Sequence, residues 1–285
     1  MDRAPRADWR VDQQLWIEAF VIANFGGLVL DIYLAHSENA FRRSSEYIPL
    51  YFSAAAPVAL LAGIALRARA NAVWRDVGYL VGWLAVLVGL AGVVLHLDSQ
   101  FFHSRTLRSL TYAAPFAAPL AYTGLGLLLI VNRMVKPDDI EWAHWVLLLA
   151  QGGFAGNFVF SLTDHAMNGF FNAAEWIPVV SSAFAVSFLM VPFLMAVTRR
   201  FLMLCAAVLG VQALVGLIGF ALHLRAVFRQ PGPTVFERLL TGAPPMAPLL
   251  FPNLVILGLI GLWVLGRRLP SDQTSSPARP FYIRA

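Results

Sequence analysis

Two related stretches decide the fold of this chain. Residues 87–97 have the sequence LVGLAGVVLHL and residues 214–224 have LVGLIGFALHL, with identical residues at eight of eleven positions. Each stretch lies in an apolar run of the length that crosses the hydrocarbon core of a bilayer, for which about 20 residues are needed. The chain therefore contains membrane-spanning helices, and at least one of them occurs in two related copies.

The composition of the whole chain is that of a protein immersed in lipid. Of its 285 residues, 59% are hydrophobic and only 13% are charged, whereas soluble domains carry about 25% charged residues because their surface faces water. Cys205 is the only cysteine, so an intrachain disulfide is excluded, and it lies in an apolar run. A soluble enzyme, a secreted disulfide scaffold and a disordered tail are all excluded. We expect an all-α integral membrane protein in a lipid bilayer.

Eight apolar windows predict eight transmembrane helices. Each window has about the length that spans roughly 30 Å of hydrocarbon. The windows are 15–35, 50–67, 77–97, 113–132, 144–163, 177–197, 201–222 and 246–266. An even number of spans places both termini on the same side of the membrane.

The basic residues predict which side that is. Fourteen Lys and Arg residues lie at the two ends and in the even-numbered connections, against seven in the odd-numbered connections, and an excess of Lys and Arg marks the cytoplasmic side. The fourteen are Arg3, Arg6, Arg10, Arg67, Arg69, Arg75, Arg133, Lys136, Arg199, Arg200, Arg267, Arg268, Arg279 and Arg284. We expect cytoplasmic N- and C-termini in a bacterial-type inner membrane. Because this asymmetry explains the net charge of +5, we expect no nucleic-acid partner.

The chain also matches itself outside the apolar windows. Residues 36–49 (HSENAFRRSSEYIP) match residues 165–178 (HAMNGFFNAAEWIP) at an offset of 129, with shared His, Asn, Phe, Glu, Ile and Pro. Residues 114–120 match 243–249 at the same offset, and the opening pair of stretches matches at 127. We expect a tandem repeat of four helices plus four helices. An even number of helices per copy gives a parallel repeat, with a pseudo-two-fold axis along the membrane normal.

The repeat predicts how the chain is divided. The first four-helix repeat is expected over residues 1–136 and the second over 137–269, and a mobile cytoplasmic tail rich in Pro, Ser and Arg is expected over 270–285.

Four histidines occupy equivalent places in the two copies: His36 matches His165, and His96 matches His223. Under the predicted topology all four lie at the extracytoplasmic ends of helices. Imidazoles at one level of the membrane are plausible ligands for Cu, Zn or Fe. The alternative is that interfacial histidines simply meet headgroups and water. Carboxylates at the same level are candidates for orienting the ligands or relaying protons: Glu46, Glu175, Asp31 and Asp98.

Glycines precede two of these histidines by four and seven residues. They are Gly92 and Gly89 before His96, and Gly219 and Gly216 before His223. On a helix these positions share one face with the histidine, so haem b could pack on that face with the imidazole as axial ligand. The alternative is close helix packing.

The sequence leaves the arrangement of metal ligands open. Ligation of haem by two histidines would pair His36 with His96, and His165 with His223. A single copper or di-metal site would use all four histidines together.

Helix-start signals accompany the matched histidines. Pro49 and Pro178 suit the first turn of a helix. Glu46 and Glu175 come just before them. A carboxylate at this place is explained equally well by helix capping, by metal ligation or by proton transfer. Four further prolines mark the starts of the fourth and eighth helices, or kinks in them: Pro115, Pro119, Pro244 and Pro248.

Two further ionisable residues lie near the predicted cytoplasmic face. Glu18 lies about one turn inside the first window, and we expect its side chain to snorkel to water; the alternative is an entry point for protons. His144 is expected at the solvated interface.

The leading hypothesis from the sequence is a membrane metalloprotein that holds haem b or another redox metal through the four histidines. It would carry out electron transfer or oxidoreduction with a lipid-soluble partner such as quinol, or with another membrane redox protein, as a subunit of a membrane oxidoreductase. Sequence motifs of P-loop enzymes, serine hydrolases, zincins and c-type cytochromes do not occur. The alternatives are a transporter or metal permease that uses the same residues as a transient site, and a non-catalytic scaffold or assembly subunit.

Overall fold

The computed structural model describes residues 12–269. Within these residues the chain is all-helical, with no strand. The predicted tail at 270–285 and three of the orientation residues, Arg3, Arg6 and Arg10, lie outside the described residues. The helices are α1 Gln13–Ser37, α2 Tyr47–Leu66, α3 Asn71–Asp98, α4 Phe101–Ser104, α5 Leu107–Thr111, α6 Leu120–Met134, α7 Ile140–Met167, α8 Trp176–Leu194, α9 Arg199–Arg229, α10 Val235–Thr241 and α11 Leu250–Arg268. Three 3-10 turns accompany them, η1 Ser44–Glu46, η2 Ala173–Glu175 and η3 Ala247–Leu249.

Seven of the helices described in residues 12–269 are long and apolar enough to cross a membrane. They are α1, α2, α3, α7, α8, α9 and α11, three of them together with the 3-10 turn before them. The chain is therefore a polytopic helical membrane protein whose apolar surface suits a lipid bilayer.

The helix predicted at residues 113–132 begins later in the structure than expected. The corresponding helix, α6, has 15 residues and begins only at Leu120, so at 1.5 Å per residue it is about 22 Å long. Residues 112–119 before it form turns instead of the first helical turns. The apolar window begins before Pro115 and Pro119, the prolines expected at the start of this helix, and it therefore extends the helix too far toward the N-terminus.

The prolines at the other helix starts are where the sequence predicts them. Pro49 and Pro178 are the third residues of α2 and α8, which confirms their place in the first turn. Pro119 immediately precedes α6, and Pro248 lies in η3 directly before α11. These prolines therefore mark helix starts.

The described chain divides into two compact units. Unit 1 contains residues 12–91, 122–137 and 222–246, and unit 2 contains 92–121, 138–221 and 247–269. These boundaries differ from those of the sequence repeat, because α3 and α9 each contribute to both units.

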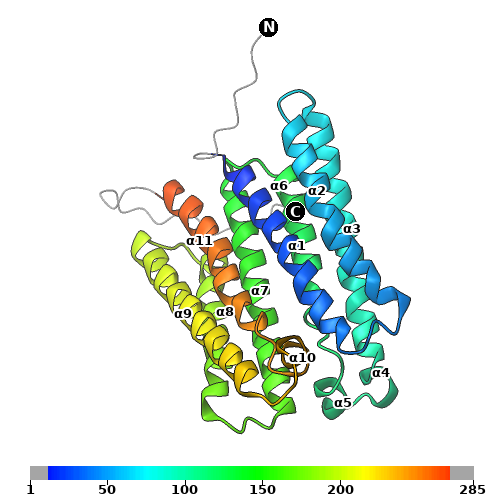
Figure 1. Cartoon of the computed structure of the whole chain (residues 1–285). Coiled ribbons are helices and arrows are strands. Elements are labelled where there is room, and N and C mark those ends of the chain that lie inside the picture. The colour runs from blue at the N-terminus through cyan, green and yellow to red at the C-terminus, as the bar shows by residue number, and fades with distance from the viewer. Residues whose placement is uncertain (1–11, 270–285) are drawn as a thin grey trace. The chain divides into compact units, whose positions relative to one another are not determined.

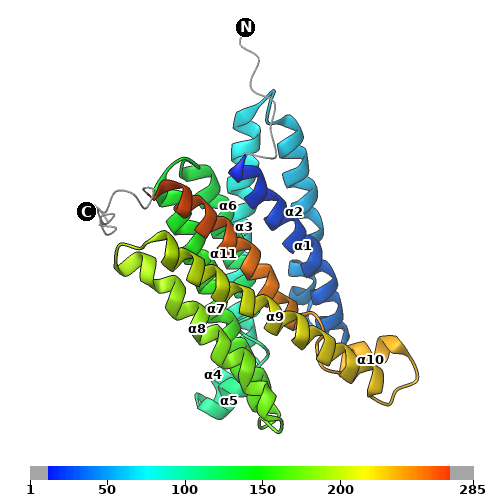
Figure 2. The ribbon, with the colours of Figure 1, turned by 90° about the vertical axis from the view of Figure 1, so that its left-hand side faces the viewer.

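Each unit is built around one long helix. In unit 1, α1 packs along α2 and is also contacted by the short helix α10, which follows α9 (Figure 1 and Figure 2). In unit 2, α7 packs against both α8 and α11 and is also contacted by the short helix α5, which follows α3. In both units, therefore, a short helix after one histidine-bearing helix contacts another histidine-bearing helix.

Candidate functional site

The two matched loops place a histidine beside a glutamate. His36 Nδ1 lies 3.5 Å from Glu46 Oε2, and His165 Nδ1 lies 3.7 Å from Glu175 Oε2. All four side chains are at most 19% exposed. Residues that match at an offset of 129 thus form the same histidine–glutamate contact in unit 1 and in unit 2.

A left-handed turn after each helix makes this pairing possible. Ala40 and Phe41 have φ of 57° and 50°, and Gly169 and Phe170 have φ of 70° and 50°. The turn closes when the N–H of Phe41 donates to the carbonyl of His36, and that of Phe170 to His165, each at 3.1 Å. The chain then reverses directly beside the imidazole.

Aromatic stacking fixes the returning chain. The Phe41 ring stacks on Tyr47 at a centroid distance of 4.6 Å, and the Phe170 ring stacks on Trp176 at 4.0 Å. Since Tyr47 and Trp176 directly follow Glu46 and Glu175, the stacks hold each carboxylate near its histidine.

Helix capping does not account for the two glutamates. Glu46 and Glu175 occupy the N-cap positions of α2 and α8, but neither side chain makes a capping hydrogen bond. Their Oε2 atoms are buried without a hydrogen-bond partner, and each faces an imidazole. The carboxylates are therefore directed toward the histidines and away from the helix ends.

The other two histidines bind backbone carbonyls. His96 Nδ1 lies 3.0 Å from the carbonyl oxygen of Pro115, and His223 Nδ1 lies 2.8 Å from that of Pro244. Because a carbonyl can only accept, Nδ1 carries the proton and donates in both contacts. These contacts connect α3 to the irregular segment before α6, and α9 to the irregular segment before α11.

The glycine faces near these histidines are covered by the chain itself. A Cβ added at Gly92 would meet Pro119, and one added at Gly219 would meet Pro248. Gly216 likewise faces the segment that contains Pro248, and Gly89 is a buried residue of α3. These contacts favour the alternative of close packing, since a macrocycle on either face would require the proline segments to move.

The remaining predicted carboxylates are half-buried. Asp31 lies on α1 and interacts electrostatically with His36. Asp98 is the last residue of α3, two residues after His96. Among residues 12–269, no three His, Cys, Asp or Glu side chains form a group that could hold a metal ion.

The division of the four histidines between the compact units differs from their division between the two sequence repeats. Unit 1 contains His36 and His223, and unit 2 contains His96 and His165. The contact of α10 with α1 and that of α5 with α7 lie within these same units. The structure thus groups one histidine from each repeat within each unit.

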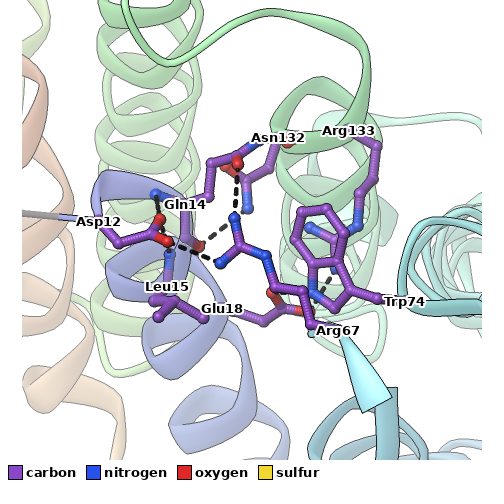
Figure 3. A network of polar contacts seen from close by, with 8 residues as sticks. All are labelled: Asp12, Gln14, Leu15, Glu18, Arg67, Trp74, Asn132 and Arg133. Carbon is purple, nitrogen blue, oxygen red and sulfur yellow. Dashed lines mark hydrogen bonds and ion pairs between the residues drawn. The ribbon is translucent and has the colours of Figure 1, made fainter. Parts of the chain in front are cut away.

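A second polar cluster lies in unit 1 and was not predicted. Glu18 and Arg133 form an ion pair in which both side chains are 0% exposed. The indole Nε1 of Trp74 donates to Glu18 Oε2 at 2.8 Å, and the guanidinium of Arg133 lies 3.7 Å from the centre of the indole ring (Figure 3). The prediction that Glu18 snorkels is wrong, because it has buried partners on α3 and α6.

The ion pair continues into a more exposed layer. Arg67 donates to Asp12 Oδ2 at 2.7 Å and to Gln14 Oε1 at 3.0 Å, and its guanidinium also lies over Trp74, at 4.3 Å (Figure 3). Gln14 and Asn132 exchange two hydrogen bonds between side chain and backbone, at 2.8 and 3.0 Å. This network joins the beginning of α1 to the ends of α2 and α6.

A small residue makes room for the buried guanidinium. A Cβ added at Gly78 of α3 would come within 2.7 Å of Arg133 Cζ. From the sequence, Arg67 and Arg133 were expected only as loop charges that set the orientation. The available signal was Glu18, a carboxylate inside an apolar window, which requires a partner or water.

His144 also differs from its prediction. Its side chain is buried in α7, where Nδ1 lies 3.0 Å from the carbonyl of Ile140, and its ring lies beside Phe193. The solvated position predicted for it is wrong, because α8 covers this face of α7.

Comparison of the chain with protein-family models, with curated proteins and with solved structures finds no match. The function is therefore argued from the geometry of the chain's own residues.

Proposed function

We propose that this polytopic membrane protein holds haem b, or another redox metal, at the ends of its helices and exchanges electrons with a lipid-soluble partner such as quinol. In this proposal the eight helices α1, α2, α3, α6, α7, α8, α9 and α11 form the parallel repeat of four plus four. Both termini are cytoplasmic, in a bacterial-type inner membrane, and the four histidines are at the extracytoplasmic side.

The observation that carries the proposal is the set of contacts made by Nδ1. His96 and His223 donate Nδ1–H to a backbone carbonyl, and His36 and His165 hold Nδ1 at 3.5 and 3.7 Å from a glutamate oxygen. Histidines that bind metals almost always donate their other ring N–H to a carboxylate, carbonyl or water, which orients the ring. In this proposal Nε2 of His96 and His223 would be the ligand atom.

The number of ligands favours haem over zinc. Zinc sites need three or four protein ligands, and no three candidate side chains form such a group within residues 12–269. Haem brings four nitrogens of its own, so two imidazoles suffice.

The contacts within the units favour a particular pairing. His36 and His223 belong to unit 1, in which α10 contacts α1, and His96 and His165 belong to unit 2, in which α5 contacts α7. We therefore pair His36 with His223, and His165 with His96, in place of the pairs within each repeat. Each haem would join one histidine from each copy.

An apolar groove supports a lipid-soluble partner. The groove, of about 510 Å³, runs along α7 and α8 and is lined by Phe158, Leu162, Phe184 and Trp176, among others. Trp176 directly follows Glu175, so a lipid-soluble molecule bound in this groove would end beside the His165–Glu175 pair. Glu46 and Glu175 would accept the protons that oxidation of a quinol releases.

The experiment is an absorption spectrum of the detergent-purified protein, combined with a haem assay and elemental analysis. We expect a Soret band and two haems per chain. A colourless protein without iron or copper would overturn the proposal and would leave a permease or a scaffold.

Double variants distinguish the pairings. His36→Ala/His223→Ala should retain one haem, because both substitutions affect the same site, whereas His36→Ala/His96→Ala should retain none. The opposite result would restore pairing within each repeat.

A further inference from the structure

The buried pair of Glu18 and Arg133 carries an inference that is independent of any metal. Both residues lie in helices of the membrane domain and both side chains are 0% exposed. Ionisable groups inside a membrane protein are costly, and they typically mark paths for ions or protons. The question is whether this pair serves the fold or a function.

The second half of the chain shows that the fold does not need the pair. At the 129-residue offset, Glu18 corresponds to Leu147 and Arg133 to Leu262. Both leucines are buried, and Leu147 packs against the position of Gly261 next to Leu262. Replacing a buried ion pair by well-packed apolar residues is often neutral or stabilising, so apolar residues suffice for packing at this place.

The pair also has unused hydrogen-bonding capacity. Each oxygen of Glu18 accepts one donor, from Arg133 Nη2 or Trp74 Nε1. Nε and Nη1 of Arg133 are buried and have no hydrogen-bond partner. Buried donors of this kind are typically satisfied by ordered water, so Arg133 provides positions for water next to the carboxylate.

The charged groups around Glu18 form a gradient of exposure. Arg67 and Asp12 are 21% and 20% exposed, whereas Arg133 and Glu18 are fully buried. Tyr79 of α3 also interacts electrostatically with Arg133. The two acids and two guanidiniums sum to zero charge, and both guanidiniums lie over Trp74, which connects the exposed pair to the buried one.

We propose that Glu18 is a proton-binding site, reached through the layer of Asp12 and Arg67. A proton is transferred from hydronium to Glu18 Oε1, which leaves a neutral water and a neutral carboxylic acid. The bond to Arg133 Nη2 breaks, and the guanidinium keeps its charge. Protonation therefore removes the ion pair between α1 and α6, while the two hydrogen bonds between Gln14 and Asn132 remain, and it gives the cluster a net charge of +1.

The test is infrared difference spectroscopy of the full-length protein between about pH 5 and pH 8, the range in which folded proteins are most stable. The wild type should show the carbonyl stretch of one protonated buried carboxyl at the acidic end, with the shift expected in D2O. The band should disappear in Glu18→Gln and persist in Asp76→Asn, a control at an exposed carboxylate outside the cluster.

A second variant separates proton binding from folding. If Glu18→Gln does not fold, Glu18→Leu/Arg133→Leu replaces it, because this variant carries the residues of the second half. Loss of the band in a folded variant supports the site. A band that persists without Glu18, or a wild type with no such band in this range, overturns the proposal and leaves the pair a structural contact.

Discussion

Glu18 in α1 and Leu147 in α7 are 129 residues apart and occupy equivalent places with opposite chemistry. Glu18 is held by Arg133 and Trp74, whereas Leu147 packs at Gly261 among apolar side chains. Both positions are fully buried. Positions that match in the sequence therefore contain a buried ion pair in one half and apolar packing in the other.

The residues around the two positions differ together. At the offsets of 129 and 127, Arg133 corresponds to Leu262, Trp74 to Phe201 and Gly78 to Cys205. Gly78 is the position that leaves room for the guanidinium, while Cys205 fills its position and is buried. Because Glu18, Arg133 and both neighbours of the guanidinium are changed together, the second half lacks the buried part of the charged cluster.

The largest effect is expected when only one member of the ion pair is removed. Glu18→Leu leaves Arg133 buried without a counter-charge and should lower the free energy of unfolding by about 3–5 kcal/mol. Adding Arg133→Leu should restore stability to the wild-type level or exceed it by about 1–4 kcal/mol. Equilibrium unfolding in mixed micelles measures both changes.

The exposed Arg75–Asp76 pair supplies the control for this experiment, because both side chains are more than half exposed. Asp76→Leu should change stability little. If the single and the double substitution at Glu18 and Arg133 were equally destabilising, the two residues would not be energetically coupled.

The second prediction concerns the room for the guanidinium. In Gly78→Ala the new methyl group would lie 2.7 Å from Arg133 Cζ, and such overpacking should cost about 1–3 kcal/mol of stability. The cost should disappear in the Glu18→Leu/Arg133→Leu background. Gly124→Ala in α6 is the control, because nothing lies within 4 Å of its added Cβ, and it should stabilise the helix by about 0.5–1 kcal/mol.

The third prediction concerns Ala40 and Gly169, the matched residues of the two left-handed turns. Ala40 has φ of 57° where the matched loop has Gly169 at 70°, and this conformation costs a residue with a Cβ about 1–2 kcal/mol. Ala40→Gly should therefore raise the free energy of unfolding by about 1 kcal/mol, and Gly169→Ala should lower it by about the same amount. Changes of the same sign would show that the two loops are not equivalent.

The smallest effect is expected at Tyr122, for which the second half has Phe251. The Tyr122 hydroxyl bonds with Ser53 and donates to the carbonyl of Pro49, whereas in the second half Ser182 donates directly to the carbonyl of Pro178 at 2.6 Å. Tyr122→Phe should let Ser53 take the same role, so the loss should be only about 0.5 kcal/mol in thermal unfolding. A loss as large as that of Glu18→Leu would show that Ser53 does not replace Tyr122 as the donor to the carbonyl of Pro49.

Much of the fold could be predicted because its causes are local in the sequence. Apolar windows indicated the long helices, and Pro49 and Pro178 marked helix starts, since proline acts on its own turn. The length of α6 was overestimated because its apolar window begins before Pro115 and Pro119, the prolines expected at the start of the helix. The matched loops were found from shared residues, but the direction of Glu46 toward His36 depends on the left-handed turn and the stack of Phe41 on Tyr47.

The sequence by itself determined the solvent of this protein, the helices that cross it and the internal similarity, because partition into lipid depends on the composition of one continuous segment. Only the tertiary structure decided that Arg133 is a buried partner of Glu18 and not a charge in a loop. These two residues are 115 positions apart. An ion pair depends on distance in space, and that distance is set by how α1, α3 and α6 pack around Gly78.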